Sequence, residues 1–134
     1  MSAHRHSNSS IRTALKRVRG LGSAKGGTSD FFRQRVSAIG LVLLIVPVIV
    51  VIMSLLGRNQ AGAAQILGSP LIAIIMILFI IASTWHMKIG MQVVIEDYVQ
   101  DERLKLVAVI ANTFFAAAVG LASIYAIVKL SSGV

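Results

Sequence analysis

His86 is the residue whose type and position most strongly indicate chemistry, because it lies within an apolar stretch. An ionisable side chain at membrane depth is costly, and such residues are candidates for function by default. On a helix that turns about 100° per residue, Ala82 and Gly90 lie one turn on either side of His86 on nearly the same face. Glycine costs a helix interior about 1 kcal/mol relative to alanine, so Gly90 indicates close approach of another helix or of a flat ligand. The alternative is a packing histidine that bonds to a carbonyl.

Three further side chains are candidates for a role alongside His86. Asp97 falls within about 20° of His86 around a continuous helix, where it could orient its neighbour Tyr98 or relay protons. Tyr98 is also typical of the aromatic belt at a membrane surface. Arg35 precedes a long apolar stretch, where anchoring by a cytoplasmic positive charge would explain it. Lys88 lies on the opposite helical face from His86, so we expect it to extend toward the head groups or to pair with a partner subunit.

The composition of the chain is that of a membrane protein. Of 134 residues, 56% are hydrophobic and only 13% are charged, whereas roughly a quarter are charged in soluble proteins. Long uncharged apolar runs exclude a soluble nucleic-acid binder despite the net charge of +8. Because the sequence has no cysteine, it forms no disulfide, and any iron-sulfur cluster must belong to a partner.

Three apolar stretches are each long enough to cross the hydrocarbon core, which needs about 20 residues. They cover residues 36–56, 70–95 and 104–130. The sequence therefore predicts an all-α membrane protein, with a three-helix transmembrane anchor domain at residues 30–134. Pro47 should kink the first span mildly, and Pro70 suits the first turn of the second. We expect residues 62–69 to form a short connection between these two spans.

The amino-terminal segment 1–29 carries six Lys and Arg residues, no acid, and many Ser and Gly. This pattern predicts a flexible basic tail that is attracted to anionic lipid. It also resembles a mitochondrial transit peptide, but the chain begins with the tail attached, which favours a bacterial protein. His4 and His6 are too flexibly placed in it to be metal ligands.

The positions of the basic residues predict an orientation, since cytoplasmic segments carry the excess of Lys and Arg. Eight such residues precede the first span, through Arg35, while the first loop has Arg58 alone. The second loop has Arg103 and Lys105. We therefore expect a cytoplasmic amino terminus and a periplasmic carboxyl terminus in a bacterial inner membrane, with the mitochondrial inner membrane as the alternative. Three spans enclose little space, so partner helices are implied.

One known family matches this pattern of residues. His86, Gly90, Met91, Gln92 and the triplet Asp97-Tyr98-Val99 resemble the second transmembrane helix of the succinate dehydrogenase (complex II) hydrophobic membrane-anchor subunit, the smaller cytochrome b556-type anchor. A second patch before the first span also resembles that family. Its residues are Asp30, Phe31, Arg35, Ser37, Ala38 and Ile39. The resemblance extends from Asp30 to about Leu130. Some members have histidine at the position of Ser29, so a contact made through that side chain is not carried over.

The resemblance implies a role for each candidate. His86 would be an axial ligand of haem b, shared with a histidine of a sister cytochrome b anchor subunit because only this histidine lies at membrane depth. Arg35 would bind a haem propionate, with Arg33 as the weaker candidate. Tyr98 would donate a hydrogen bond to ubiquinone, the substrate, with support from Asp97. No residue here would carry succinate chemistry, since FAD and the iron-sulfur clusters would reside in the flavoprotein and iron-sulfur subunits.

Two other functions remain open from the sequence. The chain could anchor a fumarate reductase, in which electrons travel the opposite way. It could instead be a small membrane interaction or proton-transport protein, in which His86 and Asp97 form a proton path.

Overall fold

The structure is a computed structural model that describes residues 24–133, with side chains from Gly27 onward. It consists of helices α2 (Ala24–Leu55), α3 (Gln60–Leu67), α4 (Pro70–Tyr98) and α5 (Glu102–Ser132). Most of the predicted basic tail, with His4 and His6, lies outside the described residues. The last residues of segment 1–29 begin α2, which is therefore longer at its start than the predicted span 36–56.

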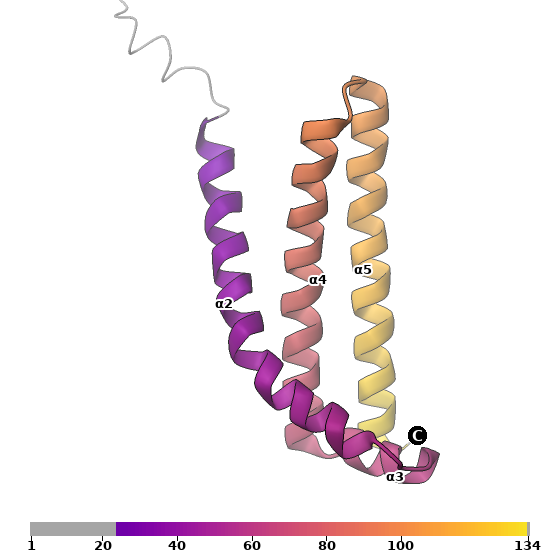
Figure 1. The fold of residues 1–134 in the computed structure, drawn as a ribbon. Helices are drawn as coiled ribbons and strands as arrows, with labels where there is room; N and C mark the ends of the chain where they lie inside the picture. Colours follow the sequence, from indigo (N-terminus) through magenta and orange to yellow (C-terminus); the bar gives the residue numbers. More distant parts are fainter. Residues whose placement is uncertain (1–23, 134) are drawn as a thin grey trace, which may run out of the picture.

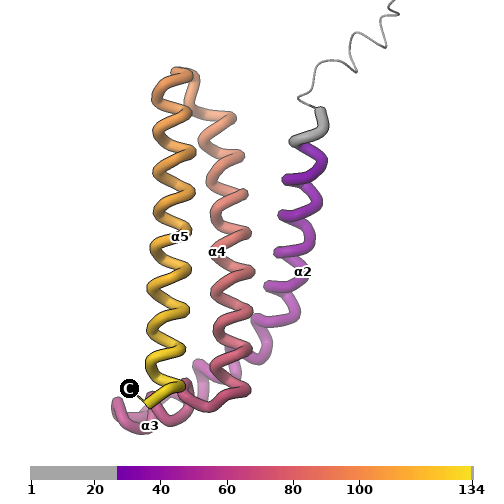
Figure 2. The backbone as a smooth tube through the Cα atoms, turned by 180° about the vertical axis from the view of Figure 1, so that it is seen from behind, coloured from indigo at the N-terminus to yellow at the C-terminus, as the bar shows by residue number. Residues whose placement is uncertain are grey.

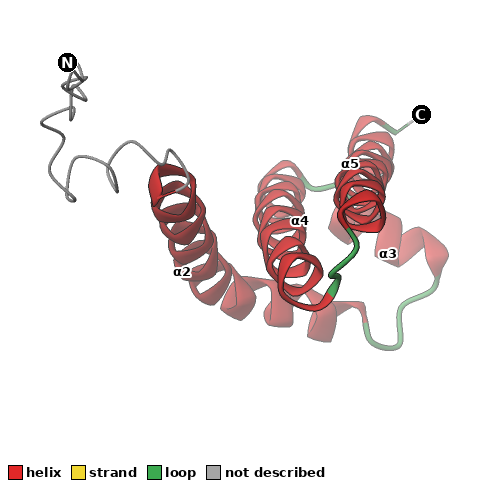
Figure 3. Ribbon diagram, turned by 90° about the horizontal axis from the view of Figure 1, so that it is seen from above, coloured by secondary structure: helices red, strands yellow, loops and turns green. Residues whose placement is uncertain are grey.

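The three long helices form a row with α4 in the middle (Figures 1 and 3). Helix α4 packs against α2 on one side and against α5 on the other. The start of α2 and the α4–α5 loop lie at one end of the row, and α3 crosses the other end, beside the carboxyl-terminal end of α5 (Figure 2). The candidate residues His86, Asp97 and Tyr98 are therefore on the central helix, and Arg35 is on α2.

Each of α2, α4 and α5 contains a segment long and apolar enough to span a membrane, at 27–55, 70–98 and 102–132 within the described residues. Most large apolar side chains on these helices are exposed in the isolated chain. Exposed apolar surface on this scale requires lipid or partner helices. The prediction of an all-α membrane protein with three transmembrane helices is confirmed.

Local sequence signals explain where the helices begin. Pro70 occupies the first turn of α4, where a missing N–H costs nothing. The side chain of Asp101 caps α5 by accepting a hydrogen bond from the backbone N–H of Leu104 at 2.8 Å.

Pro47 lies inside α2 and clashes with the carbonyl one turn earlier, which accounts for the bend in the middle of that helix (Figure 1).

The connection expected at residues 62–69 is helical instead. Asn59 caps α3 by accepting a hydrogen bond from the N–H of Gly62, and the N–H of Gly68 closes it on the carbonyl of Ala64. Gly68 also packs directly against the end of α5, because a Cβ there would lie 2.7 Å from the carbonyl oxygen of Leu130. This short helix is thus stabilised by its caps and by a tertiary contact.

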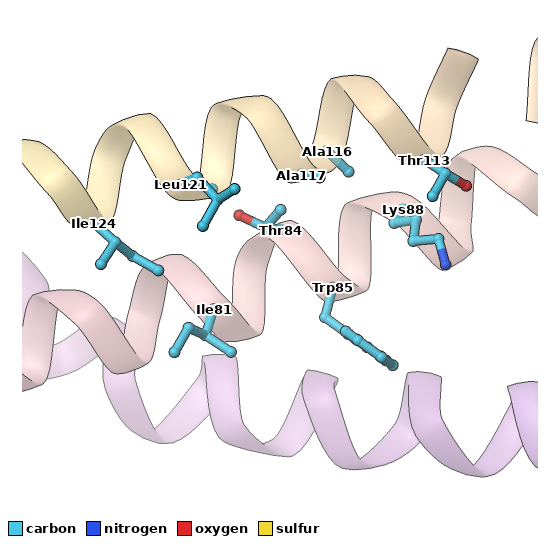
Figure 4. Close-up of a pocket in the computed structure, with 10 residues that line it drawn as sticks. Ile81, Thr84, Trp85, Lys88, Thr113, Ala116, Ala117, Leu121 and Ile124 are labelled. Carbon is cyan, nitrogen blue, oxygen red and sulfur yellow. The ribbon is translucent and has the colours of Figure 1, made fainter. Parts of the chain in front are cut away.

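Small residues allow α4 and α5 to approach closely. A Cβ on Gly120 would lie 3.2 Å from Cγ2 of Thr84, so a larger residue would separate the helices. The buried Asn112 donates a hydrogen bond of 2.9 Å to the carbonyl of Lys88. Figure 4 shows the shallow groove beside this contact, with Thr84 directed toward α5 and Ala116 and Ala117 facing it. Helices α4 and α5 therefore pack against each other through small residues and one buried hydrogen bond.

Candidate functional site

His86 lies on the side of α4 that faces α2, where it contacts a buried serine. The hydroxyl of Ser37 on α2 is 3.1 Å from Nδ1 of the imidazole, and the same hydroxyl donates a hydrogen bond of 2.9 Å to the carbonyl of Gln34. Ser37 is buried and His86 is half-buried. In the described part of the chain the other ring nitrogen, Nε2, has no hydrogen-bond partner. The imidazole is therefore held from one side and free on the other.

Two hollows between α2 and α4 meet at His86. The larger, about 480 Å³, is almost wholly apolar; its lining residues are Leu41, Val42, Ile45, Phe79, Ser83, His86 and Met87. The smaller, about 250 Å³, is more polar; its lining residues are Phe31, Gln34, Arg35, Ala38 and His86. Together these residues form what we call the His86 face. It offers an imidazole, a guanidinium and apolar walls to a ligand or partner in the membrane.

Arg35 comes from α2 and lines the smaller of the two hollows beside His86. Its guanidinium lies over the ring of Phe31, with 4.9 Å from Cζ to the ring centroid. In the part of the chain that the structure describes, no acidic side chain pairs with Arg35, and its side chain is exposed. Arginine can bind a carboxylate through two parallel hydrogen bonds. The structure thus places a free guanidinium and His86 at one hollow.

Tyr98 and Asp97 lie apart from His86, at the end of α4. Tyr98 is twelve residues further along, about 18 Å at the helical rise of 1.5 Å per residue. Its side chain is 81% exposed, and Asp97 is exposed as well. Neither makes a hydrogen bond to another side chain among residues 27–133. The two therefore form a second, open position at the end where α2 begins and where the α4–α5 loop lies.

Lys88 and Gly90 are two further residues of α4 whose surroundings were predicted from the sequence. Lys88 faces α5, away from His86, with Nζ over the ring of Trp85 at 5.7 Å. A Cβ on Gly90 would meet only the side-chain amide of Gln34, at 3.9 Å, so none of the described helices approaches Gly90 closely. The space beside Gly90 remains available to a ligand or partner.

Sequence reasoning missed several of the contacts that shape this site. Ser37 was noted as part of a matching patch, but nothing in the sequence indicated that it would meet His86, 49 residues away. The Thr84–Gly120 contact was also missed, although Ala116 and Gly120, spaced four apart, are a small-residue pattern that favours helix packing.

The donor set of the His86 face fits an axial ligand for a haem rather than a complete metal site. Residues 24–133 contain no group of three or more His, Cys, Asp or Glu side chains able to hold a metal ion by themselves. A haem requires only axial ligands, because the macrocycle supplies the others, and imidazole is one of the commonest. Apolar walls beside an unpaired guanidinium also match a macrocycle that carries carboxylates.

These features define a multi-pass integral membrane protein with an open face that bears a histidine. By comparison of sequences, the chain belongs to the family described as succinate dehydrogenase/fumarate reductase transmembrane subunit, which matches residues 9–120.

Individual relatives support the same assignment. The succinate dehydrogenase hydrophobic membrane anchor subunit of Paracoccus denitrificans is 33% identical over 121 residues, which cover 90% of this chain and 93% of the relative. The subunit of that name from Rickettsia bellii is 31% identical over 107 residues, 78% of this chain and 84% of the relative. Its counterpart from Rickettsia conorii is 26% identical over 108 residues. No solved structure matches this chain significantly.

Proposed function

We propose that this chain is the membrane-anchor subunit of a succinate:ubiquinone oxidoreductase. The observation that carries the proposal is the match to a succinate dehydrogenase hydrophobic membrane anchor subunit over 90% of the chain. As an anchor it docks a flavoprotein subunit and an iron-sulfur subunit at the cytoplasmic face, and it pairs with a second cytochrome b anchor subunit. The partners would hold FAD and iron-sulfur clusters, which would supply the oxidation of succinate and the transfer of electrons to ubiquinone.

In this proposal the His86 face holds haem b together with the sister anchor. From this chain His86 would ligate the haem iron, and a histidine of the partner would be the second protein ligand, since the described chain has a single histidine at membrane depth. Arg35 binds a propionate, supported by its position at the same hollow as His86. When bound, the haem supplies a one-electron carrier whose potential depends on its ligands and their surroundings.

The open position at Tyr98 binds the quinone. Its phenol donates a hydrogen bond to a quinone carbonyl and polarises that carbonyl as negative charge develops during reduction. Asp97, the preceding residue, orients the site or relays the protons that reduction consumes. The 81% exposure of Tyr98 supports this role, because the side chain is free to meet a ligand and a partner subunit.

The placement of charges supports a bacterial inner membrane with the amino terminus in the cytoplasm. Arg103 and Lys105 lie in the first turn of α5, at the end of the row near Tyr98 where α2 also begins, and Arg58 follows α2 at the end near α3. Residues 1–29 then form a basic cytoplasmic tail at anionic lipid, and residues 30–134 form the anchor. A fumarate reductase anchor, the second candidate, shares the family and the same face.

Purification from membranes followed by an absorption spectrum and identification of the partners tests the proposal. We expect a b-type spectrum together with a flavoprotein and an iron-sulfur protein. His86→Leu removes the axial nitrogen without opposing membrane insertion, so the reduced-minus-oxidised haem signal should be lost or altered. A colourless homo-oligomer would contradict the anchor role and favour a small interaction or transport protein. An unchanged spectrum and haem content in the variant would remove His86 from the ligand role.

A further inference from the structure

We infer that Ser37 is a positioning residue for His86, which fixes the proton of the imidazole on Nδ1 and leaves the lone pair of Nε2 for the haem iron. The inference deepens the proposed function and rests on it. The inference concerns which imidazole nitrogen of His86 binds the iron, how the imidazole ring is oriented, and how strongly that nitrogen donates electrons to the iron. Nothing in the sequence pattern assigns a role to Ser37.

The argument begins with the single hydrogen of the serine hydroxyl. That hydrogen is donated to the carbonyl oxygen of Gln34, one turn earlier on α2, at 2.9 Å. The hydroxyl oxygen also lies 3.1 Å from Nδ1 of His86, so in this second bond it can only accept. Nδ1 must therefore carry the proton. In a neutral imidazole with Nδ1–H, Nε2 is the unprotonated nitrogen and is the one able to bind a metal.

Burial makes this arrangement stable. Ser37 is only 8% exposed, so water does not compete for its hydroxyl. No buried polar side-chain atom in the described part of the chain lacks a partner. The Ser37 hydroxyl provides hydrogen-bond partners for both the carbonyl of Gln34 and Nδ1 of His86. Because the serine is on α2 and the histidine on α4, the position of the ring depends on the packing of two helices.

The bond should also change how strongly His86 donates to iron. A histidine that donates its second N–H to an acceptor becomes a more basic ligand with a fixed ring plane, and loss of such an acceptor typically lowers metal affinity by about 10- to 100-fold. A stronger donor favours the ferric form. Removal of the acceptor should therefore move the haem midpoint potential to a more positive value and release the orientation of the ring.

The test uses the whole complex purified from membranes and compares Ser37→Thr with Ser37→Val. These two side chains have nearly the same shape and differ by a hydroxyl against a methyl group. We measure haem content per flavin, the midpoint potential by redox titration and the low-spin ferric electron paramagnetic resonance signal. Ser37→Thr should retain the wild-type values. Ser37→Val should lose haem or retain it with a more positive potential and a shifted or broadened signal.

Ser54→Ala is the matched control, because the hydroxyl of Ser54 makes the same kind of bond on α2, to the carbonyl of Val51, and has no contact with His86. It should leave all three measurements unchanged. Any result in which Ser37→Val is no more altered than Ser37→Thr overturns the inference, whether both variants are normal or both are defective. Absence of haem from the wild-type complex would instead defeat the proposed haem role, and retention of the normal signal in His86→Leu would remove His86 from the ligand role.

Discussion

Replacement of Tyr98 by phenylalanine separates a quinone-binding tyrosine from an interfacial anchor. The change removes one hydroxyl and keeps the ring. Because Tyr98 is 81% exposed and its hydroxyl makes no hydrogen bond to another residue among 27–133, the variant should cost this chain almost no stability. Complex content should therefore stay near that of the wild type, and any large effect must come from a ligand or a partner.

The size of the effect follows from what the hydroxyl does. Loss of a donor aimed at developing negative charge typically costs two to three orders of magnitude, and a neutral donor costs less. We expect quinone reduction to fall by about one to three orders of magnitude, equivalent to about 1.4–4 kcal/mol at 1.36 kcal/mol per tenfold change. Succinate oxidation with an artificial acceptor that takes electrons from the partner subunits should persist, since flavin and clusters lie outside this chain.

The assay is the ratio of quinone-linked to artificial-acceptor activity in membranes of matched complex content. Tyr125→Phe is a suitable control, because Tyr125 is also exposed, at 68%, but lies in the second half of α5, far along the chain from the end that bears Tyr98. It should leave the ratio unchanged. A wild-type ratio in Tyr98→Phe would refute the reasoning and shift the quinone site to partner residues.

Three further predictions concern orientation, packing and the haem carboxylates. A periplasmic reporter should be inactive when fused after Ser29 and active after Val134, and the reverse pattern would overturn the proposed orientation. Gly68→Ala should lower the thermal stability of the purified complex by about 1–3 kcal/mol, because the new Cβ would lie 2.7 Å from a backbone oxygen of α5, whereas Gly40→Ala, with no atom within 4 Å, should not. Arg35→Gln should lower haem content more than Arg35→Lys, since only the lysine keeps a positive charge for a propionate; equal, normal haem content in both would remove Arg35 from this role.

Several features were predictable from local sequence because a bilayer restricts what a chain can do. Apolar stretches of this length must be helical, since backbone groups in lipid have no water to bond with. Pro70 predicted the start of α4 because proline fits the first turn of a helix, where its missing N–H costs nothing. The candidate residues His86, Tyr98 and Asp97 were also found from residue types and their spacing on one helix.

Features that join distant parts of the chain required the structure. Helix α3 was missed because eight residues form a marginal helix alone, and it is held by the cap at Asn59 and by the contact of Gly68 with α5. The position of α4 between α2 and α5 could not be predicted either, because the hydrophobic periodicity of one segment does not show which helices it contacts. Sequence determined that a histidine would lie at membrane depth, but only the packing of α2 on α4 decided that a serine hydroxyl 49 residues away would hold its ring, because such contacts depend on how two helices meet.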